Sequence, residues 1–222
     1  MVEHRPSSLV AATLACVAIV ATMLFGCSDT VDPAADPASP TAADPNATPA
    51  ATSGDLSQDD LPAPEDLGRD WQYRVDMGNA EDGYVGSGEP AIAREPESVI
   101  AALTPLGCRP VPLPTPDRAL EVTYQRKATP GVGLILQFDD QATATEFFDG
   151  HAEGLRRCVS APRVNVEIVR DATGVFVTTR TEELGETPSW VEAMAVSGNE
   201  VTLIAVADPT ARGIRSVTTA IA

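Results

Sequence analysis

Positive charge is scarce in this sequence of 222 residues. Fifteen Lys and Arg residues stand against 32 Asp and Glu residues, the formal net charge is −17, and Lys127 is the only lysine. Nucleic-acid binding and charge-driven attraction to anionic lipid both depend on clustered basic side chains. We therefore expect no basic patch that could neutralise phosphates and no nucleic-acid partner. The acidity favours solubility instead.

Histidine is scarcer still, because His4 and His151 are the only two. Nucleophilic catalysis needs a nucleophile, a base and a group that orients the base, and the Gly-x-Ser-x-Gly elbow of many hydrolases is absent. His151 falls on the apolar face of an expected helix, which favours a buried core histidine over a catalytic base. The carboxylate pairs Asp139-Asp140 and Glu182-Glu183 are typical of solvated edges or caps. We assign no catalytic residue and expect a protein that is not an enzyme, with a hydrolase as the less favoured alternative.

Metal and phosphate motifs are also missing. Residues 78–89 are rich in glycine, but no Lys-Ser/Thr pair follows them, as a phosphate-binding loop requires. The acidic spacing from Asp76 to Glu89 does not match a calcium-binding loop. Two cysteines and one histidine in the expected domain are too few for a four-ligand zinc site without carboxylates. We expect no metal and no cofactor.

A hydrophobic segment near the N-terminus ends in Leu24-Phe25-Gly26-Cys27. This stretch resembles a bacterial lipobox, which predicts a signal peptide at residues 1–26 and lipidation of Cys27. The alternative is an uncleaved transmembrane helix over Leu9 to Phe25, with Cys27 incidental. Both interpretations place the rest of the chain on the extracytoplasmic side of the cell membrane, and the first anchors it there by lipid.

Residues 27–66 have the composition of a tether. From residue 28 onward this segment holds seven Pro, nine acidic residues and no basic residue. It shows no apolar period of 2 or 3.6, so it predicts a disordered linker that like charges extend.

Residues 67–222 predict one α+β domain, a mainly antiparallel twisted sheet with about three helices packed on it. Alternating apolar residues indicate the strands, and helical spacing with caps indicates the helices. The expected strands cover residues 67–75, 120–125, 132–138, 164–168, 175–179, 190–196 and 201–206, and the expected helices start near residues 95, 140 and 208. Gly150 and Gly154 lie inside the second helix, where they indicate close packing against a sheet or a partner.

Four cysteines remain to be assigned. Cys16 lies in the removable segment and Cys27 is the expected lipidation site, which leaves Cys108 and Cys158. An even pair in an oxidising compartment favours a structural disulfide between them. Metal ligation and a reactive thiol are the alternatives.

The domain resembles the PknH-like extracellular sensor domain family, whose members occur on actinobacterial kinases and on stand-alone lipoproteins. The residues that carry the resemblance are Phe138-Asp-Asp-Gln-Ala142, Ala144, Phe147-Phe148, Cys158 and Val196-Ser-Gly-Asn-Glu-Val201. The resemblance implies a twisted antiparallel sheet with helices packed on it and a cleft for an unidentified ligand. The kinase domain is absent, and the cysteines suffice for one of two family disulfides.

Together these features favour a non-enzymatic module that binds a small-molecule or protein ligand at the cell envelope. Trp71, Tyr73, Tyr84 and Trp190 are candidate pocket aromatics, although each also suits an ordinary core position. The sequence therefore assigns no ligand-binding residue. A structural or assembly lipoprotein is the alternative function.

Overall fold

The structure is a computed structural model that describes residues 52–222, apart from residues 76, 80–83, 105–107, 160–163 and 183–188. The fold lies within the unit of residues 43–222, from residue 52 onward. Cys27 and most of the expected tether lie outside the described residues, so lipidation stays a prediction. Across the described ranges, no helix combines the length and the apolar character that a membrane crossing needs.

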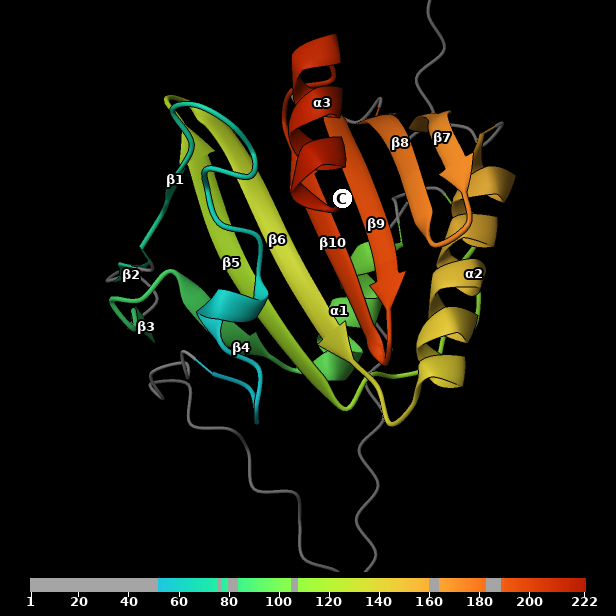
Figure 1. The fold of residues 1–222 in the computed structure, drawn as a ribbon, viewed down its shortest axis with the longest axis horizontal. Helices are drawn as coiled ribbons and strands as arrows, with labels where there is room; N and C mark the ends of the chain where they lie inside the picture. Colours follow the sequence, from blue (N-terminus) through green and yellow to red (C-terminus); the bar gives the residue numbers. More distant parts are fainter. Residues whose placement is uncertain (1–51, 76, 80–83, 105–107, 160–163, 183–188) are drawn as a thin grey trace, which may run out of the picture. The chain divides into compact units, whose positions relative to one another are not determined.

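The fold consists of three α-helices and ten strands within the described residues (Figure 1). The helices are α1 (Pro96–Leu103), α2 (Gln141–Cys158) and α3 (Ala211–Ala220), with a short 3-10 helix, η1, at Gln58–Asp60. The strands are β1 (Gln72–Tyr73), β2 (Gly78–Asn79), β3 (Tyr84–Val85), β4 (Ala91–Arg94), β5 (Arg118–Arg126), β6 (Thr129–Gln137), β7 (Val164–Ala172), β8 (Val175–Glu182), β9 (Trp190–Ser197) and β10 (Glu200–Val206).

Eight of these strands form one antiparallel sheet in the order β1-β5-β6-β10-β9-β8-β7, and β4 also pairs with β5. The hairpins β5–β6, β7–β8 and β9–β10 follow the chain, as their alternating sequences predict. The pairing of β6 with β10 joins the two halves of the sheet. The predicted α+β class with a mainly antiparallel sheet is confirmed.

Both faces of the sheet are covered (Figure 1). On one face α3 and the segment around η1 bury a cluster that includes Leu120, Val122 and Ile204. On the other face α1 and α2 bury a second cluster that includes Leu136, Phe147 and Leu203. Alternate residues of the same strand enter opposite clusters because successive side chains of a strand point to opposite faces.

The second helix shows how the sequence specifies this packing. Asp140 caps α2, and its carboxylate accepts a hydrogen bond from the Thr143 backbone N–H at 2.8 Å. The predicted apolar face, from Ala144 through His151 to Cys158, is buried against the sheet. Gly150 and Gly154 face Leu113 and Val111, so the close packing occurs against the proline-rich segment rather than against a sheet or a partner.

The predicted start of the domain at residue 67 lies too late in the chain. Leu56 and Leu61 are 1% and 4% exposed and belong to the core beneath the sheet. The Tyr124 hydroxyl donates a hydrogen bond to the carbonyl oxygen of Pro62, which fastens this segment to β5. The proline and acidic residues of segment 53–66 predict a tether, but Leu56 and Leu61 pack into the core on the sheet.

Three further details differ from the sequence prediction. Ala91–Arg94 forms a strand beside β5, although it carries no clear alternation. Within the glycine-rich residues 78–89, where no strand is expected, β2 pairs with β3. Ile168 follows Val164 and Val166 in the alternation of its strand, yet it is 37% exposed, at the point where the pairing of β7 with β8 shifts register between Ile168 and Arg170.

The predicted disulfide is present. Cys108, which follows α1 in the chain, is bonded to Cys158, the last residue of α2, and their Cα atoms lie 5.4 Å apart. This separation lies in the usual range for disulfides. The bond closes a loop with a sequence separation of 50 residues and holds the proline-rich segment against α2.

Candidate functional site

An open groove of about 310 Å³ lies along α3. We call it the α3 groove. The residues that line it are Glu65, Asp66, Leu67, Gly68 and Arg69 from the loop before β1, Arg126 from the end of β5, and Arg212, Arg215, Ser216 and Thr219 from α3. Four arginines from three distant parts of an acidic chain therefore meet in one depression.

Local capping sets the position of α3 and hence of its arginines. The Thr210 hydroxyl caps the helix by accepting a hydrogen bond from the Arg212 backbone N–H at 3.3 Å. Arg212 and Arg215 follow three residues apart, so both side chains leave the same face of the helix. Gly213 between them is buried and lies directly against the backbone of Asp208, where a larger residue would not fit.

The loop that forms the opposite wall has a specific backbone conformation. Gly68 has φ of 108°, and Asp70 has φ of 72°, in the left-handed region that non-glycine residues seldom adopt. The Gly68 N–H donates to the Glu65 carbonyl at 2.9 Å, and the Ala63 N–H donates to the Asp66 carboxylate at 2.9 Å. These contacts define a turn that holds Arg69 at the groove.

Arg126 forms the fixed part of the groove. Its side chain is nearly buried, donates to an Asp208 carboxylate oxygen at 2.7 Å, and stacks 4.8 Å above the Trp71 ring. Burial would raise the pKa of Asp208, but hydrogen bonds from Thr210 and Arg126 outweigh this effect and hold the pKa below its usual range. The charges of Arg126 and Asp208 therefore balance each other.

The other three arginines are exposed, and no ion pair joins Arg69, Arg212 or Arg215 to a carboxylate among the residues that the structure describes. The prediction that the chain has no basic patch is thus wrong at this groove. Arg212 and Arg215 share a helix face that the sequence could have indicated, but only the fold brings Arg69 and Arg126 beside them.

A larger depression of about 640 Å³ lies between α2 and the β7–β8 turn. Two charged residues that line it bind each other: Arg156 donates two hydrogen bonds to Asp171, at 3.0 and 2.9 Å. The Arg156 guanidinium holds the pKa of Asp171 below its usual range. Since these charges satisfy one another, the depression offers fewer free recognition groups than the α3 groove.

His151 lies beside a small cavity at the disulfide. The cavity measures about 20 Å³, enough for one water molecule, and Cys108, Gly150 and His151 are among its lining residues. The Nε2 atom of His151 lies 3.2 Å from the carboxylate of Glu192. His151 is 5% exposed and is a buried core residue, as the sequence predicted.

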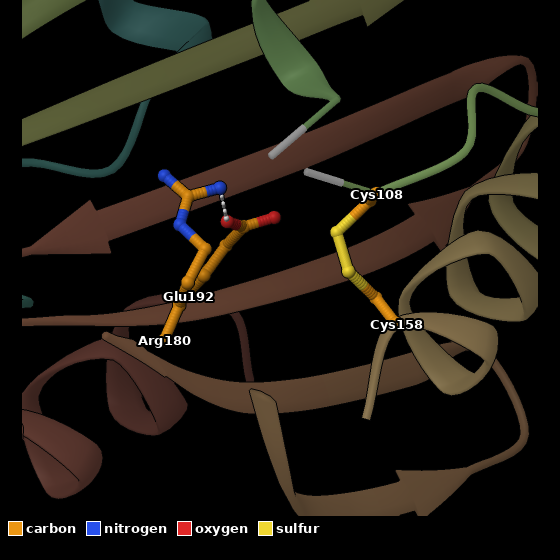
Figure 2. Close-up of a disulfide and its surroundings, with 4 residues drawn as sticks. All are labelled: Cys108, Cys158, Arg180 and Glu192. Atoms are coloured by element: carbon orange, nitrogen blue, oxygen red, sulfur yellow. Dashed lines mark ion pairs between the residues drawn. A yellow bond between two sulfur atoms is a disulfide. The ribbon is translucent and has the colours of Figure 1, made fainter. Parts of the chain in front are cut away.

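Glu192 is buried between His151 and Arg180 and faces both of them. Its second oxygen lies 3.7 Å from an Arg180 guanidinium nitrogen, and Figure 2 shows this pair near the disulfide. Burial alone would raise the pKa of Glu192, but the hydrogen bond from His151 and the charges of His151 and Arg180 hold it below its usual range. The arrangement is that of a structural ion pair in a closed interior.

The three aromatic candidates whose side chains the structure describes lie at different places in the fold. Trp71 is buried beneath Arg126, and Tyr73 stacks on Tyr124 with ring centroids 5.7 Å apart. Trp190 is half-buried at the start of β9, and the side chain of Tyr84 lies outside the described residues. Trp71 lies beneath the guanidinium of Arg126, a groove residue, and supports it.

The carboxylates considered for chemistry serve other roles or lie outside the description. Asp140 caps α2, and the hydrogen bonds from Thr143 lower its pKa. Asp76, Glu183 and the side chain of Glu182 are not described, so the expectations for the Glu182-Glu183 pair and for the acidic spacing from Asp76 to Glu89 are not tested there. Across the described part of the chain, His, Cys, Asp and Glu side chains form no group of three that could hold a metal ion.

The geometry defines an α+β domain with an arginine-lined groove on one face. No protein-family model and no curated protein sequence matches the chain. Among solved structures, the extracellular domain of PknH from Mycobacterium tuberculosis is similar, with a TM-score of 0.43 and 11% sequence identity over 75% of this chain and 90% of that chain. This is a weak likeness of fold, and no role of any residue follows from it.

Proposed function

We propose that the protein is a recognition module held at the extracytoplasmic face of the cell membrane by lipid on Cys27. In this proposal the folded domain binds an anionic ligand in the α3 groove and does not transform it. The observation that carries the proposal is the set of exposed arginines, Arg69, Arg212 and Arg215, which have no ion-pair partner within the described ranges.

Unpaired arginines in a groove favour binding over a purely structural role. A guanidinium presents donors in a rigid fork that matches an anionic group, and such charge-assisted hydrogen bonds are stronger than neutral ones. The α3 groove also reaches the lower end of the volume range of small-molecule sites. In a chain with a net charge of −17, this local reversal of sign gives an anion a defined place to bind.

Native mass spectrometry of the protein purified from its own host tests this proposal. We expect the wild-type chain to retain a bound anionic molecule, and we expect the double variant Arg212→Gln, Arg215→Gln to lose it. Glutamine keeps the helix-forming propensity of α3, so the loss would report on the groove rather than on folding.

The matched control is the double variant Arg157→Gln, Arg170→Gln, which removes the same charge from exposed sites outside the groove. It should retain the ligand. Equal retention by both double variants, or no retained ligand in the wild type together with no anion binding in solution, would contradict the proposal.

The anchor is tested separately by metabolic labelling with a palmitate analogue. We expect wild-type protein to carry the label and a Cys27→Ala variant to lose it, because only Cys27 follows the lipobox-like stretch. A Cys16→Ala variant is the control and should stay labelled. Label on the Cys27→Ala variant, or none on the wild type, would favour an uncleaved transmembrane helix.

A further inference from the structure

We infer that the ligand of the α3 groove is a phosphorylated polyol, with its phosphate at Arg69, Arg212 and Arg215 and its hydroxylated body along Ser216 and Thr219. This inference rests on the proposed function and names the chemical class of its ligand. It follows from the order of side chains along α3 and from the charge at each part of the groove.

The three exposed arginines of the α3 groove match a phosphate better than they match a carboxylate. The α3 groove has three guanidinium groups for a ligand, those of Arg69, Arg212 and Arg215, since Arg126 is already paired with Asp208. A phosphate monoester carries a charge of about −1.5 to −2 at neutral pH and presents three strong acceptor oxygens. A carboxylate has one charge and two oxygens, so it would leave part of the guanidinium set unmatched.

The rest of the groove suits hydroxyl groups. Arg212, Arg215, Ser216 and Thr219 follow a helical spacing of three, one and three residues, so they form one stripe along α3. With a rise of about 1.5 Å per residue, this stripe is about 10 Å long. Ser216 and Thr219 can donate and accept hydrogen bonds, and the carboxylates of Glu65 and Asp66 on the opposite wall accept from ligand hydroxyls.

Isothermal titration calorimetry on the full-length protein in mild detergent tests the inference. We expect inorganic phosphate to bind and glycerol 3-phosphate to bind more tightly. The double variant Arg212→Gln, Arg215→Gln should weaken both by about tenfold or more, because it removes charge-assisted hydrogen bonds to the phosphate. The double variant Arg157→Gln, Arg170→Gln should bind both ligands as the wild type does.

A Thr219→Val variant separates the body of the ligand from its phosphate. Valine has the shape of threonine without the hydroxyl, and Thr219 is exposed on α3. We expect it to weaken glycerol 3-phosphate by about fivefold, the value of one hydrogen bond, and to leave inorganic phosphate unchanged. Equal loss for both ligands, or no loss for either, would overturn the assignment of the hydroxyl end.

Citrate distinguishes failure of the inference from failure of the proposed function. If citrate binds as tightly as glycerol 3-phosphate and the arginine variants lose both, the groove is a general anion site and the phosphate assignment is wrong while the proposed function stands. If the arginine variants change neither titration nor the retained ligand, both are wrong.

The phosphorylated polyol has two chemical sources, a soluble molecule or a lipid headgroup. Co-sedimentation with vesicles that contain phosphatidylinositol 4-phosphate, whose polyol headgroup carries a phosphate monoester, distinguishes them once glycerol 3-phosphate binding is established, and phosphatidylinositol vesicles without that monoester are the control. Binding to phosphatidylinositol 4-phosphate that the Arg212→Gln, Arg215→Gln variant loses identifies the headgroup. Binding that this variant keeps would place the lipid contact elsewhere and overturn the headgroup source.

Discussion

Replacing both Cys108 and Cys158 by serine is expected to lower the free energy of unfolding by about 4 kcal/mol. The disulfide closes a loop with a sequence separation of 50 residues, and in the chain-entropy model a loop of this length restricts the unfolded chain by that amount. For a domain of this size the melting temperature should fall by roughly 10 °C. Urea denaturation followed by tryptophan fluorescence measures the difference.

Reduction supplies the control for this prediction. Dithiothreitol should destabilise the wild-type protein to the level of the double serine variant and should not change the variant further. A Cys16→Ser variant, which leaves the disulfide intact, should unfold like the wild type. Equal stability of wild type and double variant would mean that the loop is already restricted without the bond.

Replacing Glu192 by glutamine is expected to lower the free energy of unfolding by about 3–5 kcal/mol at neutral pH, because breaking a buried ion pair by removing one of its members is strongly destabilising. Glu192 is buried, with Arg180 at 3.7 Å and His151 at 3.2 Å. Glu153→Gln is the matched control. Glu153 pairs with Arg156 and Arg157 on the surface of α2, where an ion pair contributes about 0–1 kcal/mol.

The same variant changes how stability depends on pH. The pKa of Glu192 lies below its ordinary value of 4.5 in the folded protein, so the unfolded chain takes up this proton first as the pH falls. The stability that Glu192 contributes is therefore complete above about pH 4.5 and is lost as the pH falls through the folded pKa. In Glu192→Gln this part of the acid dependence should vanish.

Urea titrations between pH 3 and pH 7 check this prediction. The free energy of unfolding of the wild type should fall more steeply below pH 4.5 than that of Glu192→Gln, so the two curves approach each other in acid. Parallel curves over the whole range would show that the folded pKa of Glu192 is not lowered.

The fold was predictable where local patterns agree with the tertiary packing. Apolar runs separated by short turn sequences specified the hairpins β5–β6 and β9–β10. Helical spacing and the Asp140 cap specified α2 and its buried face. The cysteine pair was predictable by elimination, since Cys16 and Cys27 fall in the expected signal segment and at its expected end.

The N-terminal boundary was not predictable in the same way. Residues 53–66 carry the proline and acidic residues of a linker, and their leucines fall at no regular period. These leucines are buried because the sheet face beside α3 would otherwise be partly uncovered. Composition describes the average of a segment, whereas docking depends on a few side chains and on a surface formed elsewhere in the chain.

The candidate site could not be predicted from the sequence for a related reason. Net charge is a sum over the whole chain, and a sum of −17 hides a local excess of arginine. Arg69, Arg126 and Arg212 are separated by more than fifty residues each, and their meeting depends on the positions of β5 and α3. The spacing of Arg212 and Arg215 was the one local signal.

The pairing of β6 with β10 has a consequence for how the chain folds as it is synthesised. Seven residue pairs join these strands at the middle of the sheet, although β10 lies near the C-terminus. A chain that emerges N-terminus first, from a ribosome or through a membrane pore, presents β6 with one edge open until β10 arrives. An unpaired strand edge can pair with another chain and start aggregation. We therefore expect correct folding of this protein to depend on protection of the free edge of β6 until β10 has emerged.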